Sequence, residues 1–166
     1  LAVSTAGVIT WDASSNATGY EISFDGESYE SATSGSNYLS TLTASAGTKT
    51  VYVKAINSDS ENYVSNSESI VDTNVSVYSV ALNKVTGIEE VTGAGNYLNG
   101  STVSLSATIS EGYAWSKWQN TVDVTTVSTD NPYEFEIDES VELTAVAAVQ
   151  GFIVTFDANG GKIDDS

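Results

Sequence analysis

Apolar and polar residues alternate with a period of two along most of this chain, and no stretch keeps the period of a helix. Successive side chains of a β-strand point to opposite faces, so the alternation predicts strands that bury one face. The strands expected in the first part of the chain are residues 8–11, 20–24, 37–42 and 50–56. The fold class predicted for the chain is therefore all-β.

The alternation also predicts which side chains of the first part share a core. They are Ile9, Trp11, Tyr20, Ile22, Phe24, Val51, Val53 and Ala55. Turn-forming pairs, Asp25-Gly26 and Ala46-Gly47, separate the strands that carry them. Two facing sets of inward apolar residues indicate a β-sandwich.

Three segments of this part carry a family resemblance: Val8-Ile9-Thr10-Trp11-Asp12-Ala13, Ala17-Thr18-Gly19-Tyr20-Glu21-Ile22, and Val51-Tyr52-Val53-Lys54-Ala55-Ile56-Asn57. Together they resemble a bacterial fibronectin type III domain over residues 1–73. The resemblance implies an immunoglobulin-like sandwich with Trp11 as the core tryptophan, and with Tyr20 and Ala55 at the aromatic and small positions that pack over it. Lys49 stands where family members commonly carry the tyrosine of the tyrosine corner.

Residues 72–76 are short and polar, and we interpret them as a linker between two domains. After them the alternation resumes, which predicts a second domain at residues 77–148. Its apolar positions are Tyr78, Val80 and Leu82, then Val103, Leu105 and Ala107, then Tyr133, Phe135 and Ile137, and finally Val141, Leu143 and Ala145.

Two short motifs of the second domain carry another resemblance. They are Gly112-Tyr113-Ala114-Trp115-Ser116-Lys117-Trp118 and Asn131-Pro132-Tyr133. They resemble the divergent form of the internalin B-type (Listeria–Bacteroides) bacterial repeat, which implies that Tyr113 and Trp118 belong to the core of a small β-rich domain. The alternation places Phe135 in the same core. Residues 151–166 look like the start of a further repeat, so we interpret the chain as part of a modular bacterial surface protein.

Composition excludes several classes of function. Five Lys and Arg residues against 22 Asp and Glu give a formal charge of −17, which disfavours nucleic acid and anionic membrane surfaces. Histidine and cysteine are absent, which removes zinc sites, thiolate chemistry and His-based acid–base catalysis. The adjacent carboxylates at Glu89-Glu90, Asp138-Glu139 and Asp164-Asp165 are interpreted as solvated surface groups rather than a glycosidase pair. We therefore predict that this segment is not an enzyme.

Calcium is the one cofactor that the sequence leaves open. Asp59 and Glu61 lie close together with Asn57 and Asn62, and the segment Asp157-Ala158-Asn159-Gly160 imitates the start of an oxygen-rich metal loop. Neither segment has the full ligand spacing of an EF-hand, and Asn-Gly is also the expected sequence of a tight hairpin turn. Ordinary turns are the favoured interpretation, and no other cofactor is expected.

Carbohydrate binding is the main alternative function, because exposed tryptophan side chains stack on sugar rings. Trp115 and Trp118 are the candidate stacking residues. Their spacing of three would place them on opposite faces of a regular strand, so we expect at most one of them in the core.

The sequence as a whole predicts a non-catalytic spacer or adhesion segment of a modular, secreted or cell-surface bacterial protein. It opens with Leu1 and is rich in Ser, Thr, Asn and Gly, which we interpret as a piece of a longer exported chain. The expected partners are host or environmental glycans or proteins, without membrane insertion, and the expected state is monomeric. The alternative is a carbohydrate-binding module or an accessory domain of an extracellular polysaccharide-degrading enzyme.

Overall fold

The computed structural model describes residues 1–57 and 70–151. Within these residues the chain forms fourteen strands and one short helix, α1 (Leu39–Leu42). The strands are arranged in three sheets. The prediction of an all-β, sandwich-like fold is confirmed.

The first seven strands build the first sandwich. One sheet contains β1 (Ala2–Val3), β2 (Val8–Thr10) and β5 (Ser36–Asn37), in the order β1-β2-β5. The facing strands are β3 (Gly19–Ser23), β4 (Glu30–Ala32), β6 (Gly47–Ile56) and β7 (Ile70–Lys84), in the order β7-β6-β3-β4. The register places Tyr20 opposite Ala55 and Ile22 opposite Val53, as expected for two strands whose inward residues share a face.

The first core follows the predicted alternation closely. Its buried members are Ile9, Ile22, Leu42, Val51, Val53, Val77 and Leu98. Trp11, Tyr20 and Phe24 pack against them and are partly buried. Ala55 is also partly buried, but it lies outside this cluster.

The strand predicted at residues 37–42 is wrong beyond Asn37. Strand β5 ends at Asn37, and α1 follows it as a single helical turn. The Asn37 side chain accepts a hydrogen bond from the backbone N–H of Leu39 (2.9 Å), a local contact that favours a turn over an extended strand. The turn still buries Leu42, so the apolar residue that suggested a strand reaches the core from a helix.

The remaining strands build the second sandwich. They are β8 (Ile88–Thr92), β9 (Gly95–Leu98), β10 (Thr102–Ile109), β11 (Tyr113–Asn120), β12 (Thr126–Ser128), β13 (Tyr133–Glu136) and β14 (Val141–Val149). The sheet β13-β10-β8 faces the strands β12-β11-β14 and the second half of β7. The predicted alternation is confirmed, since the buried core holds Val80, Ile88, Val103, Leu105, Ala107, Trp118, Ile137, Leu143 and Ala145.

Strand β7 runs through both sandwiches without a break. Residues 70–77 pair with β6, residues 77–80 pair with β9, and residues 80–84 pair in parallel with β14. The segment 72–76, which we expected to be a linker, therefore lies inside a strand and is fully paired with residues 48–52 of β6. The two predicted domain boundaries, at residues 73 and 77, both fall within this one strand.

Along β7 the positions that carry apolar core residues shift by one residue, and we call this shift the change of phase. It explains why residues 72–76 resemble a linker in the sequence. The first core takes Val75 and Val77, whereas the second core takes Tyr78, Val80 and Leu82. Neighbouring residues of a strand face opposite sides, so the two cores lie on opposite faces of β7. The apolar alternation shifts by one residue at this point, and the sequence pattern appears interrupted although the backbone continues.

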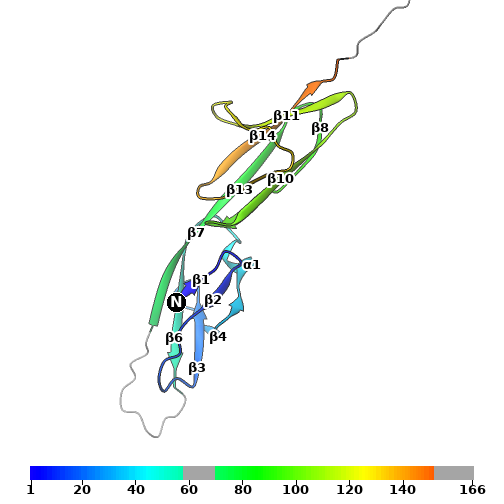
Figure 1. Cartoon of the computed structure of the whole chain (residues 1–166). Coiled ribbons are helices and arrows are strands. Elements are labelled where there is room, and N and C mark those ends of the chain that lie inside the picture. Colours follow the sequence, from blue (N-terminus) through cyan, green and yellow to red (C-terminus); the bar gives the residue numbers. More distant parts are fainter. Residues whose placement is uncertain (58–69, 152–166) are drawn as a thin grey trace, which may run out of the picture.

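Strand β9 pairs with β7 where the phase changes. Leu98 lies opposite Val77 and packs into the first core, while Tyr97 lies opposite Tyr78 and packs against the second. Figure 1 shows the result as an elongated molecule in which the two sandwiches follow one another along β7. At about 3.3 Å per residue, the 15 residues of β7 extend for about 50 Å.

Leu98 provides a test of this shared architecture. It belongs to the second part of the sequence, yet it is 2% exposed in the first core. We expect Leu98→Ala to lower the free energy of unfolding of the first sandwich by about 2–4 kcal/mol, because it leaves a cavity there. Amide hydrogen exchange at Ile22 and Val53, which lie in the first core, measures this loss. The matched control is Val122→Ala at an 85% exposed position, which we expect to cost less than about 0.5 kcal/mol; equal losses would contradict the assignment.

Candidate functional site

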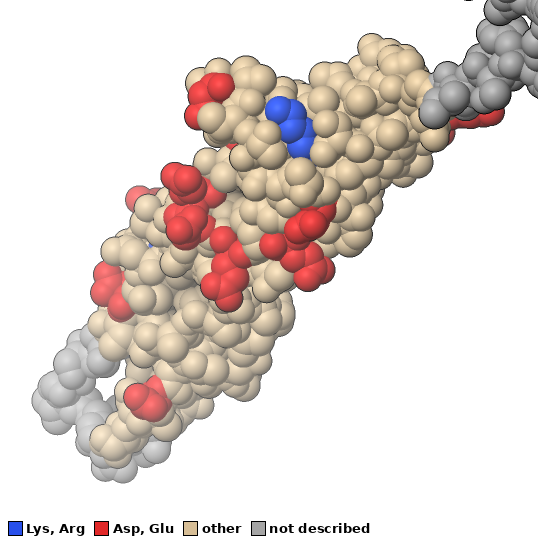
Figure 2. Space-filling model, turned by 45° about the horizontal axis from the view of Figure 1, so that its top comes forward, with Lys and Arg blue, Asp and Glu red and all other residues tan. Residues whose placement is uncertain are grey.

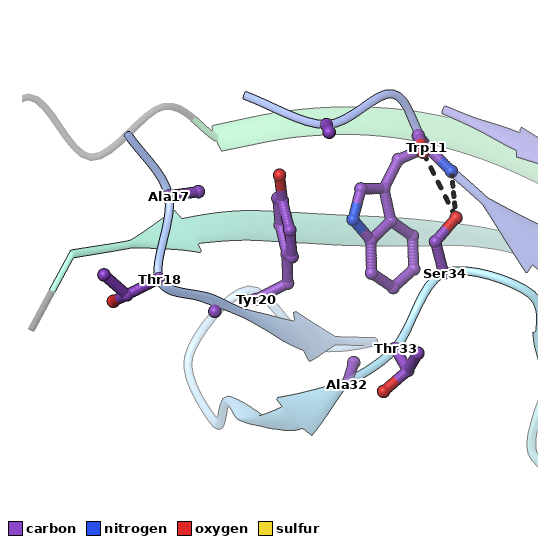
Figure 3. Close-up of a pocket in the computed structure, with 9 residues that line it drawn as sticks. Trp11, Ala17, Thr18, Tyr20, Ala32, Thr33 and Ser34 are labelled. Atoms are coloured by element: carbon purple, nitrogen blue, oxygen red, sulfur yellow. Dashed lines mark hydrogen bonds between the residues drawn. The ribbon is translucent and has the colours of Figure 1, made fainter. Parts of the chain in front are cut away.

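One hollow in the described residues lies beside two aromatic rings of the first sandwich. Trp11 follows the end of β2, and Tyr20 lies on β3, with ring centroids 5.5 Å apart and planes tilted by 56°. The hollow has a volume of about 360 Å³. It is lined by Trp11, Ala13, Ala17, Thr18, Gly19, Tyr20, Ala32, Thr33 and Ser34 (Figure 3).

Most polar groups at this hollow already have protein partners. The Ser34 hydroxyl accepts a hydrogen bond from the Trp11 backbone N–H (3.0 Å) and donates one to the Trp11 carbonyl (3.1 Å), as Figure 3 shows. The Tyr20 hydroxyl accepts the backbone N–H of Ser14 at 2.7 Å, and the Thr18 hydroxyl donates to the Ile56 carbonyl at 3.3 Å. The hollow therefore offers mainly ring and methyl surface.

The indole N–H of Trp11 is the exception. It is buried and has no acceptor among the described residues. Because the nitrogen is inaccessible to solvent, a molecule resting in the open hollow could not reach it without a movement of the rings. The indole is better described as a packing group of the sandwich than as a hydrogen-bonding group of a binding site.

A second hollow of about 230 Å³ lies against the same pair of rings. It is lined by Leu1, Trp11, Asp12, Ala13, Ser14, Tyr20, Val53, Ala55 and Val71. Asp12 is the single carboxylate that lines either hollow, whereas glycoside hydrolysis uses two facing carboxyl groups. The arrangement can shelter a small apolar or ring-shaped group, and its lining has no acid–base pair.

The two tryptophans proposed to stack on sugars lie together in the second sandwich. Trp118 is 0% exposed, and Trp115 is partly buried with its ring edge against Trp118 at a centroid distance of 5.3 Å. The Trp115 indole N–H donates to the Thr129 carbonyl at 2.8 Å. A buried ring presents no face to a sugar, so the structure does not fit a stacking role for Trp118. Trp115 remains a candidate.

A β-bulge explains why both rings reach the same core. Trp115 pairs with Ala147 and Lys117 pairs with Val146, so β11 holds one extra residue at this point. Trp118 then pairs with Ala145, two positions from the partner of Trp115, and the two tryptophans share a face. Our expectation that at most one of them lies in the core assumed a regular strand, and the bulge removes that assumption.

The other expected core residues of this part differ in their surroundings. Phe135 packs against the second core and stacks on Tyr133, with centroids 5.1 Å apart. Tyr113 lies outside that cluster, and its ring rests on Gly87, where a Cβ would come within 2.3 Å of the ring. Gly87 also has a φ of +93°, so both the close approach and the backbone conformation require glycine.

Only some of the candidate catalytic carboxylates and metal ligands belong to the residues that the structure describes. Glu89 and Glu90, which we interpreted as solvated surface groups, lie on β8 and are exposed. Asp59 and Glu61, and the segment 157–160, lie outside the described residues. Within residues 1–57 and 70–151 no three acidic side chains are grouped so that they could hold a metal ion.

Comparison with protein families bears on the second sandwich. Residues 78–148 match the family model of the divergent InlB B-repeat domain. The match begins inside β7 at Tyr78, the first residue of this strand that packs against the second core, and it ends within β14. No curated protein and no solved structure matches the chain.

This match confirms the resemblance seen in the repeat motifs, and it is compatible with a surface-associated modular protein. Fibronectin type III similarity for residues 1–73 stays a prediction. In the described residues no helix is long and apolar enough to span a membrane.

The two tryptophans of β11 yield a second prediction. We expect Trp118→Ala to lower the free energy of unfolding of the second sandwich by about 3–5 kcal/mol, because the whole ring is buried. Trp115→Ala should cost about 1–2 kcal/mol, since part of its ring already meets solvent. Urea denaturation of both variants measures the two losses, and a larger loss for Trp115→Ala would contradict this placement.

Proposed function

We propose that this chain is a non-catalytic spacer segment of a modular, secreted or cell-surface bacterial protein, which holds neighbouring modules at a fixed separation and supports adhesion. The observation that carries the proposal is the unbroken strand β7. A strand that gives one face to each of two cores leaves no free hinge between them. A segment built in this way transmits position and orientation from one end to the other.

Side-chain contacts between the sandwiches support a stiff junction. The Asn96 side-chain amide, on β9, donates to the Thr43 carbonyl at 3.0 Å in the first sandwich. The Ser101 hydroxyl donates to the Thr5 carbonyl at 3.4 Å. These bonds lie beside the buried pair of Leu98 and Val77, so polar contacts accompany the apolar ones. Bending at the junction would have to break both kinds of contact.

The strand arrangement of the first sandwich supports the fibronectin type III interpretation. Seven strands form a sheet of three, β1-β2-β5, facing four strands, β4-β3-β6-β7. Sandwiches of about seven strands are the architecture that this class of domain shares. Many cell-surface domains share this architecture, so the interpretation agrees with the proposed role.

The surface also suits a spacer. Figure 2 shows Asp and Glu side chains spread along the face in view, with one small basic area. The outer face of sheet β13-β10-β8 presents hydroxyl and carboxyl groups, from Ser104 and Thr108 on β10 to Glu90 and Glu134 on its neighbours. A surface with excess negative charge keeps protein chains soluble and apart.

The carbohydrate-binding alternative has weaker support. The hollow at Trp11 and Tyr20 has few free hydrogen-bonding groups, and sugar recognition requires them beside the aromatic faces. The exposed part of Trp115 stays the best stacking candidate. Binding on a glycan array that Trp115→Ala abolishes, with the fold intact, would favour this alternative over a pure spacer.

Distance measurements between spin labels test the spacer proposal. The chain has no cysteine, so Ser31→Cys on β4 and Glu134→Cys on β13 provide two unique and exposed labelling sites. We expect one narrow distance distribution, because the two sandwiches share a strand. A broad distribution for the otherwise unchanged chain would contradict the proposal.

A hinge variant is the matched control for this measurement. Insertion of Gly-Ser-Gly between Val77 and Tyr78 interrupts β7 at the change of phase and leaves the residues of both cores present. The inserted residues should widen the distribution strongly while each sandwich keeps its fold, as circular dichroism would verify.

A further inference from the structure

Strands β7 and β14 form the parallel pair of the second sandwich. Residues 80–84 of β7 lie in register with residues 141–145 of β14. All the other strand pairs of the described residues are antiparallel. This exception determines how a pulling force would cross the second sandwich.

The chain approaches and leaves this pair at opposite ends. Residues 70–77 of β7 lie in the first sandwich, and the strand continues from there into the pair at Val80. Strand β14 enters at Val141, runs in the same direction, and leaves the sandwich beyond Val149. Tension along the molecule therefore pulls β7 toward its N-terminal end and β14 toward its C-terminal end.

Such tension makes the two strands slide along each other. Hydrogen bonds between strands run across the strand direction, so a sliding displacement strains all the bonds of the pair together. Pulling both strands from the same end would instead open the bonds one after another, each at a lower force. We propose that the parallel pair β7–β14 is a shear clamp that lets this segment bear mechanical tension.

The surroundings of the pair support this role. Val80, Leu143 and Ala145 are buried in the second core, so sliding would also expose apolar surface. Side chains add links along the clamp: the Asn83 amide donates to the Glu142 carboxylate at 2.8 Å, and the Ser79 backbone N–H donates to the Ser140 hydroxyl at 3.0 Å. The clamp is therefore held by backbone, core and surface contacts at once.

The other edge of β14 is covered as well. It pairs with β11 from Leu143 to Val149, and the hydroxyls of Thr121 and Thr144 share a hydrogen bond of 2.9 Å. Extraction of β14 would have to break both ladders. The biological use of the clamp rests on the proposed spacer function, because only a segment between other modules carries load along its length.

Single-molecule pulling with two attachment geometries tests the clamp. In both, one handle is Asp72→Cys, which lies exposed on β7, so tension runs along this strand into the second sandwich. The second handle is Gln150→Cys, just beyond β14, or Glu139→Cys, just before it; both positions are exposed. The first geometry shears the pair and the second peels it, in a chain that has no other cysteine.

At equal loading rate, we expect the mean unfolding force in the shearing geometry to be at least about twice that in the peeling geometry. The reason is that forced unfolding is governed by the unfolding rate along the direction in which the load acts. Equal thermal melting of the two double variants excludes a difference in stability as the cause. Equal forces, or a higher force for peeling, would overturn the clamp. The label-distance experiment tests stiffness without load, so failure of the spacer proposal and failure of the clamp remain distinguishable.

Discussion

Strand β7 has to satisfy two hydrophobic cores, and this constraint shapes the rest of the molecule. Each face of a strand can belong to one core only, so β7 gives Val75 and Val77 to the first and Val80 and Leu82 to the second. The backbone hydrogen-bonding groups of β7 must also be paired along its whole length. Strands β6, β9 and β14 pair with successive parts of it. Two sandwiches arranged in this way have to lie end to end on a common strand.

The period-two pattern predicted the two cores well, because burial of alternate residues is a local property of each strand. Ile22 and Val53 in the first sandwich, and Leu105 and Leu143 in the second, are buried where the alternation places them. The interruption at residues 72–76 was misinterpreted as a linker because a shift of one residue in the apolar alternation looks the same as a break in the strand. A pattern search that allows a change of phase within one strand could have found it.

The aromatic residues show a different limit of the sequence. The bulge in β11 adds one residue to a regular strand, and the sequence Trp115-Ser116-Lys117-Trp118 has no glycine or proline to signal it. Its position depends on β14, which lies about thirty residues away and sets the register. The hollow beside Trp11 and Tyr20 likewise depends on loops from separate parts of the chain, so side-chain types alone could not predict it. The repeat family, in contrast, was predictable, because its motif residues are close in sequence.

Strand β7 continues without a hinge from the first sandwich into the second. Amide hydrogen exchange followed by NMR tests it most directly at residues 77–80, where the partner strand changes. Our account predicts that these amides are protected nearly as strongly as those of Val53 and Leu105 in the two cores. Exchange at residues 77–80 as fast as at the exposed turn residues Val122 and Asp123 would show a hinge in the strand, and would contradict the account.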